Sequence, residues 1–268
     1  MPGSNARALE KARSLDCDVV VLDLEDAVAP GDKERARQQA CAAVTAKAFG
    51  GRTVAVRINA LDYALGHAEL EAVARATPDA IILPKVSGPA EIGAVHRVLP
   101  SSIALWAMIE TSKSILHLDA IAGAGASCLI LGANDLMKDM RAQPMPGREN
   151  LWAAMNLVVM TARAHGLDAI DATFNAISDA DGFAASCRQG RAFGFDGKTL
   201  IHPSQIEAAN RIFAPSESEI EEAQRILAAF AQNPDKSVLA LDGRMVEKLH
   251  AEEAARLLAL AEAIQNRC

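Results

Sequence analysis

The stretch Val19-Val20-Val21-Leu22-Asp23-Leu24-Glu25-Asp26 decides the fold class of this chain. It opens with continuous aliphatic and β-branched residues, which is typical of a strand that is buried on both faces of a parallel sheet. It ends in Glu25 and Asp26, and carboxylates are rarely buried without a partner. The stretch therefore predicts a buried parallel strand that delivers acidic side chains to one edge of its sheet.

The same pattern recurs along the chain, where short apolar runs alternate with stretches of helical periodicity. The predicted strands cover residues 19–24, 53–58, 80–83, 103–109, 128–131, 167–170 and, more weakly, 199–201. The predicted helices between them include residues 30–49, 64–76, 89–99 and 148–165. This alternation is typical of right-handed βαβ units built around a parallel sheet.

Two architectures are built from such units, the TIM-type barrel and the open doubly wound sheet. The seven predicted strands are one short of the eight that close a barrel, but the chain begins with a loop at residues 1–5 and then a helix at 6–14, as a truncated first βα unit would. A doubly wound sheet needs a glycine-rich cofactor turn, and the sequence has neither GxGxxG nor GxxxxGK[ST]. We therefore predict an α/β protein with a TIM-type (β/α)8 barrel whose first strand is apparently truncated.

The C-terminal part differs in character from the rest, which predicts a barrel over residues 1–214 and a helical extension over residues 215–268. Ser216 and Glu219 form a capping box before an amphipathic helix. Residues 237–241 then lead to the turn Asp242-Gly243, and a last helix is predicted from Met245 onward. From the residues alone, such an arm packs either on a neighbouring subunit or on its own barrel.

Length, composition and charge exclude several classes of function. With 268 residues, 50% of them apolar, the chain suits one barrel domain with a large core. The formal net charge is −7 without any basic tract, so neither nucleic acid nor an anionic membrane surface is expected as a partner. No signal peptide or long apolar run is visible, so a soluble, cytoplasmic protein is expected.

Polar and charged residues lie near the end of almost every predicted strand or directly after it. They are Glu25, Asp26, Arg57, Asn59, Lys85, Glu110, Asn134, Asp135, Asp171 and His202. The carboxyl ends of parallel barrel strands meet at one mouth, where the active sites of this fold lie. The recurrence therefore predicts one site built from several strands.

Glu110 and Asp135 are the candidate metal ligands at this mouth. Two oxygen ligands from neighbouring strands, without nearby His or Cys, suit Mg²⁺, which keeps water molecules and shares its coordination sphere with substrate oxygens. The alternative is that Glu110 forms a buried salt bridge with Lys85 or Arg57. The residues alone leave both open.

Two basic residues of the mouth are candidates for binding an anionic substrate. Arg57 offers a planar fork that suits a carboxylate or a developing alkoxide, but it could instead form an ion pair with Glu25 or Asp26. Lys85 follows Pro84, which stops ladder bonding, so its side chain is either directed at the mouth or has a structural role.

At these residues the sequence resembles the citrate lyase beta-subunit family of acyl-CoA lyases, which includes malyl-CoA and citramalyl-CoA lyases. The resemblance covers nearly the whole chain in order. The matching segments are LEDAV at 24–28, VRIN at 56–59, LPKV at 83–86, MIET at 108–111, LGANDL at 131–136, GFDGK at 194–198, IHP at 201–203 and LDGRMV at 241–246.

The resemblance implies a TIM barrel whose C-terminal extension packs over the site of a neighbouring subunit, in a homotrimer or hexamer. It implies Glu110 and Asp135 as Mg²⁺ ligands and Arg57 as the residue that grips the substrate's carboxylate or hydroxyl group. Glu25 and Asp26 would lie behind the metal and hold its water molecules.

The implied reaction is a Mg²⁺-dependent retro-aldol (retro-Claisen) cleavage of a 3-hydroxy di- or tricarboxylic acyl-CoA, of citryl-, citramalyl- or malyl-CoA type. Its products are acetyl-CoA and a 2-oxo acid, and coenzyme A takes part as a portion of the substrate. Two positions depart from the family pattern. Asn134 stands where acidic residues are frequent, and Glu247 stands where an aspartate acts as acid and base, with Asp242 as the alternative candidate for that role.

Two other functions stay open at this point. A malyl-CoA-type thioesterase would hydrolyse the same kind of thioester and release free coenzyme A. A catalytically silent CoA-binding subunit would bind such thioesters without turnover. No residue of the mouth distinguishes one acyl group from another.

Overall fold

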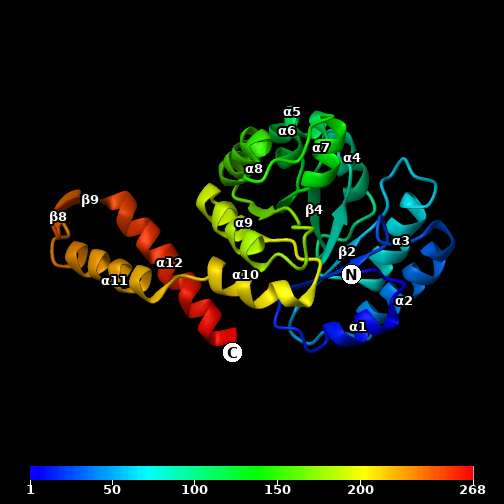
Figure 1. Cartoon of the computed structure of the whole chain (residues 1–268), viewed down its shortest axis with the longest axis horizontal. Coiled ribbons are helices and arrows are strands. Elements are labelled where there is room, and N and C mark those ends of the chain that lie inside the picture. Colours follow the sequence, from blue (N-terminus) through cyan, green and yellow to red (C-terminus); the bar gives the residue numbers. More distant parts are fainter. Residues whose placement is uncertain (268) are drawn as a thin grey trace. The chain divides into compact units, whose positions relative to one another are not determined.

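In the computed structural model, which describes residues 1–267, seven consecutive strands form one parallel sheet (Figure 1). Their bounds are β1 Val19–Asp23, β2 Thr53–Arg57, β3 Ala80–Leu83, β4 Ala104–Ile109, β5 Cys128–Leu131, β6 Asp168–Asp171 and β7 Gly197–Lys198. Each strand pairs in parallel with the next one along the chain. This is the strand order of a barrel wall.

The opening residues lie along the free edge of β1. Pro2 forms a parallel bridge with Asp23, whose N–H donates to the carbonyl oxygen of Met1 at 2.9 Å. Gly3 N–H in turn donates to the carbonyl oxygen of Asp23 at 2.8 Å. Residues 1–3, predicted as part of the opening loop of a truncated βα unit, therefore extend the sheet beyond β1.

Helices precede, connect and follow the strands of the sheet (Figure 1). Their bounds are α1 Ala6–Ala12, α2 Lys33–Thr45, α3 Gly66–Ala76, α4 Pro89–His96, α5 Ser112–Leu116, α6 Leu118–Gly123, α7 Ala133–Asp139, α8 Trp152–His165, α9 Ala180–Phe193 and α10 Ile206–Phe213. Short 3-10 helices lie at η1 Pro30–Asp32, η2 Glu149–Leu151 and η3 Pro203–Gln205. The predicted alternation of strands and helices is confirmed.

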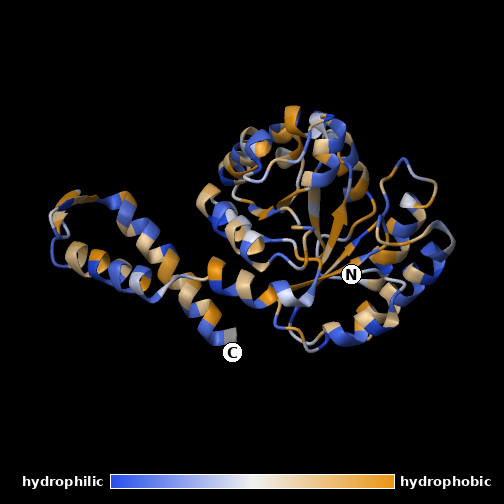
Figure 2. Ribbon diagram, viewed as in Figure 1, coloured by the Kyte–Doolittle hydropathy of each residue, from blue (hydrophilic) through white to orange (hydrophobic). Residues whose placement is uncertain are grey.

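Both faces of the sheet are apolar, which is why the strands are continuous apolar runs (Figure 2). One face, which includes Val20, Leu22 and Leu24, is fully buried. The other face forms a second cluster that includes Ala55, Ile82 and Ile130, with half-buried residues packed against it. Because successive strand residues point to opposite faces, a strand of this kind brings apolar side chains to both layers.

The last strand of the sheet lies two residues earlier than predicted. Residues 199–201 were expected as a strand, but β7 consists of Gly197 and Lys198, which pair with Ile170 and Asp171. The buried ammonium of Lys198 binds the Asp171 carboxylate, and this pair holds the two strand ends together. The predicted strand was wrong because the apolar character of Ile201, which is exposed, does not reflect burial in the sheet.

The contacts of the chain divide it into two units, Met1–Ala209 and the part from Asn210 onward. The second unit contains α11 Glu217–Ala231, a two-stranded antiparallel hairpin of β8 Val238–Leu241 and β9 Arg244–Glu247, and α12 Lys248–Arg267. Ser216 and Glu219 form the predicted capping box of α11. The unit has its own core, which includes Ala223, Leu239 and Val246.

The predicted last helix begins later than expected, because Met245 and Val246 belong to β9 and α12 begins at Lys248. The turn Asp242-Gly243 explains the difference. Both residues have positive φ, 51° and 75°, which is the backbone of a tight hairpin turn. The hairpin lets Val246 reach the core opposite Leu239.

Among residues 1–267, no helix has both the length and the apolar character that a membrane crossing requires.

Candidate active site

The ends of β1, β2, β4 and β5 bring the predicted site residues of the first unit to one edge of the sheet. Asp23 and Arg57 are the last residues of β1 and β2 and are direct neighbours in the parallel register. Glu110 follows β4 directly. Asp135 lies in the first turn of α7, which begins two residues after β5 ends. The parallel topology thus assembles the site.

Arg57 is held mainly by Asp23. Its Nε donates to Asp23 Oδ1 at 2.7 Å and its Nη2 donates to Oδ2 at 2.6 Å, while Nη1 lies 3.0 Å from Glu25 Oε2. Burial alone would raise the pKa of Asp23, but the guanidinium outweighs it and lowers that pKa below its ordinary value. Of the two ion pairs that were considered for Arg57, the structure therefore contains the one with Glu25 and not the one with Asp26.

Lys85 contacts three carboxylates, two through its ammonium and one through its backbone N–H. Its ammonium forms an ion pair with Glu25 and lies 3.6 Å from Asp26, which is exposed. Its backbone N–H donates to Glu110 Oε1 at 2.7 Å. The residue has a φ of 53°, a left-handed conformation that is unfavourable for a side chain with a Cβ and that concentrates at functional sites.

Glu110 is a buried carboxyl group, only 1% exposed. Burial raises its pKa to about 7, and the nearby carboxylates of Glu25 and Asp135 act in the same direction. The only hydrogen bond to its carboxylate comes from Lys85 N–H, within the part of the chain that the structure describes. The alternative of a buried salt bridge between Glu110 and Lys85 or Arg57 is not formed among these residues.

Gly132 is required beside Glu110. A Cβ on this residue would lie 2.4 Å from Glu110 Cβ and 2.5 Å from Glu110 Oε2, closer than atoms approach. The glycine after β5 therefore lets the acidic side chain of the neighbouring strand fit beneath the start of α7.

The two residues at the start of α7 have different surroundings. Asp135 is half-buried and close enough to Glu110 to raise the pKa of that group. Asn134 is exposed and exchanges amide hydrogen bonds with Asn175 in the loop after β6, the shorter one being 2.9 Å. Asn134 thus connects two loops at the mouth.

The acidic residues of this edge fit a hard divalent cation. Burial raises the pKa of Glu25 despite the neighbouring Arg57 and Lys85, and its Oε2 is buried without a hydrogen bond. Glu110 and Asp135 lack a cationic side-chain partner among the described residues. Within residues 1–267 no group of three or more His, Cys, Asp or Glu side chains could hold a metal ion by itself. Two oxygen donors from Glu110 and Asp135 would leave coordination positions for water and substrate, as Mg²⁺ prefers.

The predicted acid–base candidates belong to the other unit, the one from Asn210 onward. Asp242 is exposed in the hairpin turn, where its carboxylate lies 3.7 Å from Arg225 Nη1. Glu247 ends β9, and its backbone N–H donates to His250 Nδ1 at 2.9 Å. Neither is in the unit that contains Glu110.

A second buried charge cluster lies at the ends of β6 and β7. Asp171, fully buried, accepts hydrogen bonds from Arg148 Nη1 and Lys198 Nζ, both at 2.7 Å. Burial lowers the pKa of Lys198. With two cations for one carboxylate, this cluster is unsuited to a metal and instead connects the segment before α8 to the sheet.

Three residues around the site were not predicted as part of it. Asp23 holds Arg57, while Lys33 and Glu69 form a buried network with Asn59 behind the end of β1. Asp23 and Arg57 are each the second-last residue of a predicted strand, and this shared position was a signal that their side chains meet. Lys33 and Glu69 are ordinary residues of helical stretches, so nothing local distinguishes them.

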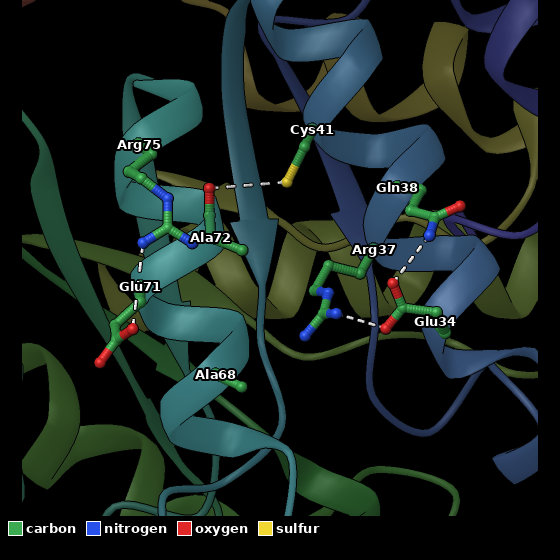
Figure 3. Close-up of a pocket in the computed structure, with 8 residues that line it drawn as sticks. All are labelled: Glu34, Arg37, Gln38, Cys41, Ala68, Glu71, Ala72 and Arg75. Carbon is green, nitrogen blue, oxygen red and sulfur yellow. Dashed lines mark hydrogen bonds and ion pairs between the residues drawn. The ribbon is translucent and has the colours of Figure 1, made fainter.

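A hollow of about 360 Å³ lies between α2 and α3, away from these strand ends (Figure 3). Its charged side chains are paired within their own helices, Arg37 with Glu34 and Arg75 with Glu71. The Cys41 thiol donates to the carbonyl oxygen of Ala72. With its charges paired and no titratable group directed into it from the sheet, this hollow is not the candidate site.

Two models of known protein families match this chain. The model of the HpcH/HpaI aldolase/citrate lyase family matches residues 1–203, and that of C–C bond lyases of the TIM-barrel fold matches residues 154–264. The predicted TIM-type fold is thereby confirmed.

Individual relatives match over nearly the whole chain. A (3S)-malyl-CoA thioesterase of Cereibacter sphaeroides (strain KD131) is 45% identical over 98% of this chain and 93% of its own length. Rattus norvegicus mitochondrial citramalyl-CoA lyase is 30% identical over 100% and 86%. A crystal structure of the protein CitE from Mycobacterium tuberculosis, in complex with magnesium, acetoacetate and coenzyme A, has a TM-score of 0.83 at 28% identity, over 98% of this chain and 96% of the other.

Proposed function

This chain belongs to the HpcH/HpaI aldolase/citrate lyase family, and we propose that it cleaves a 3-hydroxy di- or tricarboxylic acyl-CoA into acetyl-CoA and a 2-oxo acid, with Mg²⁺. The observation that carries this proposal is the pair Glu110 and Asp135 beside Arg57 at one edge of the sheet. The relatives named citramalyl-CoA lyase and citrate lyase subunit beta support it, as does the CitE complex with magnesium and coenzyme A.

Glu110 and Asp135 would hold the metal. Bound there, Mg²⁺ supplies a template and Lewis acid for the oxygen atoms of the 2-oxo acid half. Lys85 orients Glu110 through its backbone N–H, and its ammonium offsets the charge of Glu25. This arrangement keeps a buried carboxylate directed at the mouth, where the substrate would bind.

Arg57 is the residue that would stabilise charge on the reacting oxygen. Its Nε and Nη2 donate to Asp23, so the plane of the guanidinium is fixed by two short hydrogen bonds. Its Nη1 lies near Glu25 Oε2 and Met108 Sδ and makes no comparably short bond. A fixed cation that keeps N–H groups not bonded to Asp23 is suited to an oxygen that alternates between alkoxide and carbonyl.

A carboxylate of the second unit would move the proton at the methyl carbon of acetyl-CoA. Glu247 is the candidate for this role, with Asp242 as the alternative, and the unit would pack over the site of a neighbouring subunit in a homotrimer or hexamer. Glutamate has the required acid–base chemistry. The proposal follows the likeness of residues 241–246 to the family segment in which this residue is an aspartate.

A malyl-CoA-type thioesterase is the second candidate function. The observation that favours it is the 45% identity with a protein named (3S)-malyl-CoA thioesterase over 98% of this chain. The same site would then bind the same kind of thioester, but water would cleave the bond between the acyl carbon and sulfur. The products would be free coenzyme A and the intact hydroxy acid.

Product analysis by mass spectrometry separates the two functions. The purified protein is incubated with citryl-, citramalyl- and malyl-CoA, with Mg²⁺ and with EDTA. Acetyl-CoA with a 2-oxo acid, formed only with Mg²⁺, is expected. Free coenzyme A with an intact hydroxy acid would favour the thioesterase, and no turnover of any thioester would contradict both.

Glu110→Ala tests the metal assignment in the same assay. We expect a loss of about a hundredfold in rate, about 2.7 kcal/mol, because one of two protein ligands is removed. The control is Asp196→Ala, which removes a carboxylate at the opposite end of the strands, where it binds Ala169 N–H and Arg163. An unchanged rate in Glu110→Ala would refute the assignment.

A further inference from the structure

A buried ammonium group lies directly behind the site. Lys33, at the start of α2, is 7% exposed. Its Nζ donates to the carbonyl oxygens of Leu24 at 2.8 Å and Glu25 at 2.7 Å, and to Asn59 Oδ1 at 2.9 Å. The three donors of the ammonium are thereby used, and two of them hold the segment that follows β1.

The network continues from Asn59 to a buried carboxylate. Asn59 Nδ2 donates to the carbonyl oxygen of Leu24 and to the carboxylate of Glu69, each at 2.8 Å. The backbone N–H of Asn59 donates to Glu69 Oε2 at 2.7 Å, and Glu69 is 1% exposed. An ammonium and a carboxylate are therefore connected through one amide, so the buried charges compensate each other.

Satisfying the two carbonyl groups does not by itself require Lys33. The Leu24 carbonyl also accepts a hydrogen bond from Asn59 Nδ2, and the Glu25 carbonyl also accepts one from Val28 N–H at 3.0 Å. Burying an ammonium is costly unless it is fully bonded. The contribution that remains for Lys33 is to fix where the backbone of Glu25 lies.

The position of Glu25 matters because its carboxylate touches both cations of the site. Its Oε1 binds the ammonium of Lys85, and its Oε2 lies 3.0 Å from Arg57 Nη1. A shift of the Glu25 backbone would move these two contacts together, and Lys85 in turn holds Glu110.

We propose that Lys33 is a positioning residue for the reaction, which acts by fixing Glu25 and through it Arg57 and Lys85. This inference rests on the proposed function for its kinetic consequence. Its structural part, the fixing of the segment after β1, stands on the hydrogen bonds alone.

A double-mutant cycle of Lys33→Met and Glu25→Gln tests the kinetic part. Lys33→Met should lower kcat/KM about tenfold or more, because small misplacements at a site have large effects on rate. In the Glu25→Gln background, Lys33→Met should lower kcat/KM by less than about twofold, because Lys33 acts through the carboxylate that has already been removed. Additive losses would overturn the proposal, because a merely structural lysine would act equally in both backgrounds.

Arg163→Met is the matched control. Arg163 also donates to two carbonyl oxygens, those of Leu167 and Gly194, but before β6 and β7 at the opposite end of the sheet. The control should show a comparable loss of thermal stability with kcat/KM within about twofold of the wild type. A tenfold loss of kcat/KM in the control as well would overturn the proposal.

Hydrogen–deuterium exchange of residues 22–29 separates a failure of this inference from a failure of the proposed function. The amides of Glu25 and Ala27 donate to Asp23, so they report the order of the segment without any substrate or metal. Lys33→Met should exchange faster there and Arg163→Met should not. Unchanged exchange in Lys33→Met would overturn the positioning role, whereas faster exchange in a protein without turnover would refute only the proposed function.

Discussion

At the scale of single residues, Glu110 combines a functional requirement with a cost in stability. Its carboxyl group is buried, and burial together with the neighbouring Glu25 and Asp135 raises its pKa to about 7. An ordinary structural carboxylate would be paired with a cation, but among the residues that the structure describes Glu110 receives only the N–H of Lys85. In a site that binds a cation, such a carboxyl group has no cationic side chain beside it, because the metal supplies the missing positive charge.

We expect Glu110→Gln to stabilise the metal-free protein above pH 7. The unfolded carboxyl loses its proton near 4.5 and the folded one only near 7, so ionisation opposes folding at higher pH. The amide removes this penalty, on the order of 3 kcal/mol above pH 7. The gain should shrink as the pH falls from 7 toward 4.5 and vanish below it.

Urea unfolding of the two proteins in EDTA, at about pH 8 and about pH 5, measures this effect. Asp196→Asn is the control for the loss of a carboxylate. A Glu110→Gln variant that is less stable than the wild type at pH 8 would contradict the expected cause. A change in the free energy of unfolding that is equal at both pH values would contradict it as well.

At the scale of elements, the ends of β6 and β7 depend on one carboxylate. Asp171 binds Arg148 from the segment before α8 and Lys198 from β7, and all three side chains are largely buried. Lys198 is the second of only two residues in its strand. The ion pair therefore holds the shortest strand of the sheet in place as much as its backbone hydrogen bonds to β6 do.

Asp171→Asn should destabilise the first unit by about 3–5 kcal/mol, because two buried cations lose the carboxylate that binds both of them. Chemical denaturation measures this loss. Asp168→Asn, at the other end of the same strand, where the carboxyl group is exposed, should change stability by less than about 1 kcal/mol. A similar loss of stability in both variants would show that any change in β6 destabilises the unit, and that the ion cluster has no special part in it.

At the scale of the whole molecule, the candidate metal ligands and the candidate acid–base residues belong to different units. Glu110 and Asp135 are in the unit that ends at Ala209, and Glu247 and Asp242 are in the other. The second unit has its own core between α11, α12 and the hairpin. Binding of the metal and transfer of the proton should therefore be separable by mutation.

Glu247→Gln should lower kcat by about a hundredfold or more while the affinity for Mn²⁺, as a probe of the Mg²⁺ site, stays unchanged. Steady-state kinetics and electron paramagnetic resonance titration measure the two quantities. Glu252→Gln, an exposed change on α12, is the control. An unaffected kcat in Glu247→Gln, with a loss in Asp242→Asn instead, would transfer the role to Asp242.

Much of the fold could be predicted because its signals are local. The strand and helix pattern follows from runs such as 19–24 and from periodic helices such as 152–165, and the parallel topology places every strand end at one edge. That rule was enough to group Arg57, Lys85, Glu110 and Asp135. The errors at β7 and at Met245 arose where tertiary contacts outweigh local apolar character, through the Asp171–Lys198 pair and the hairpin core.

The sequence by itself thus determined the barrel architecture and the edge at which the chemistry gathers, because both depend on hydrophobic patterning and strand order. Only the tertiary structure decided which charges meet. Whether Arg57 pairs with Glu25 or Asp26, that Asp23 also binds it, and whether Glu110 meets an ammonium or a backbone N–H all depend on distances of a few ångströms between different strands. Lys33 shows the same limit, since its three acceptors, 8, 9 and 26 residues away, come from the ends of two different strands.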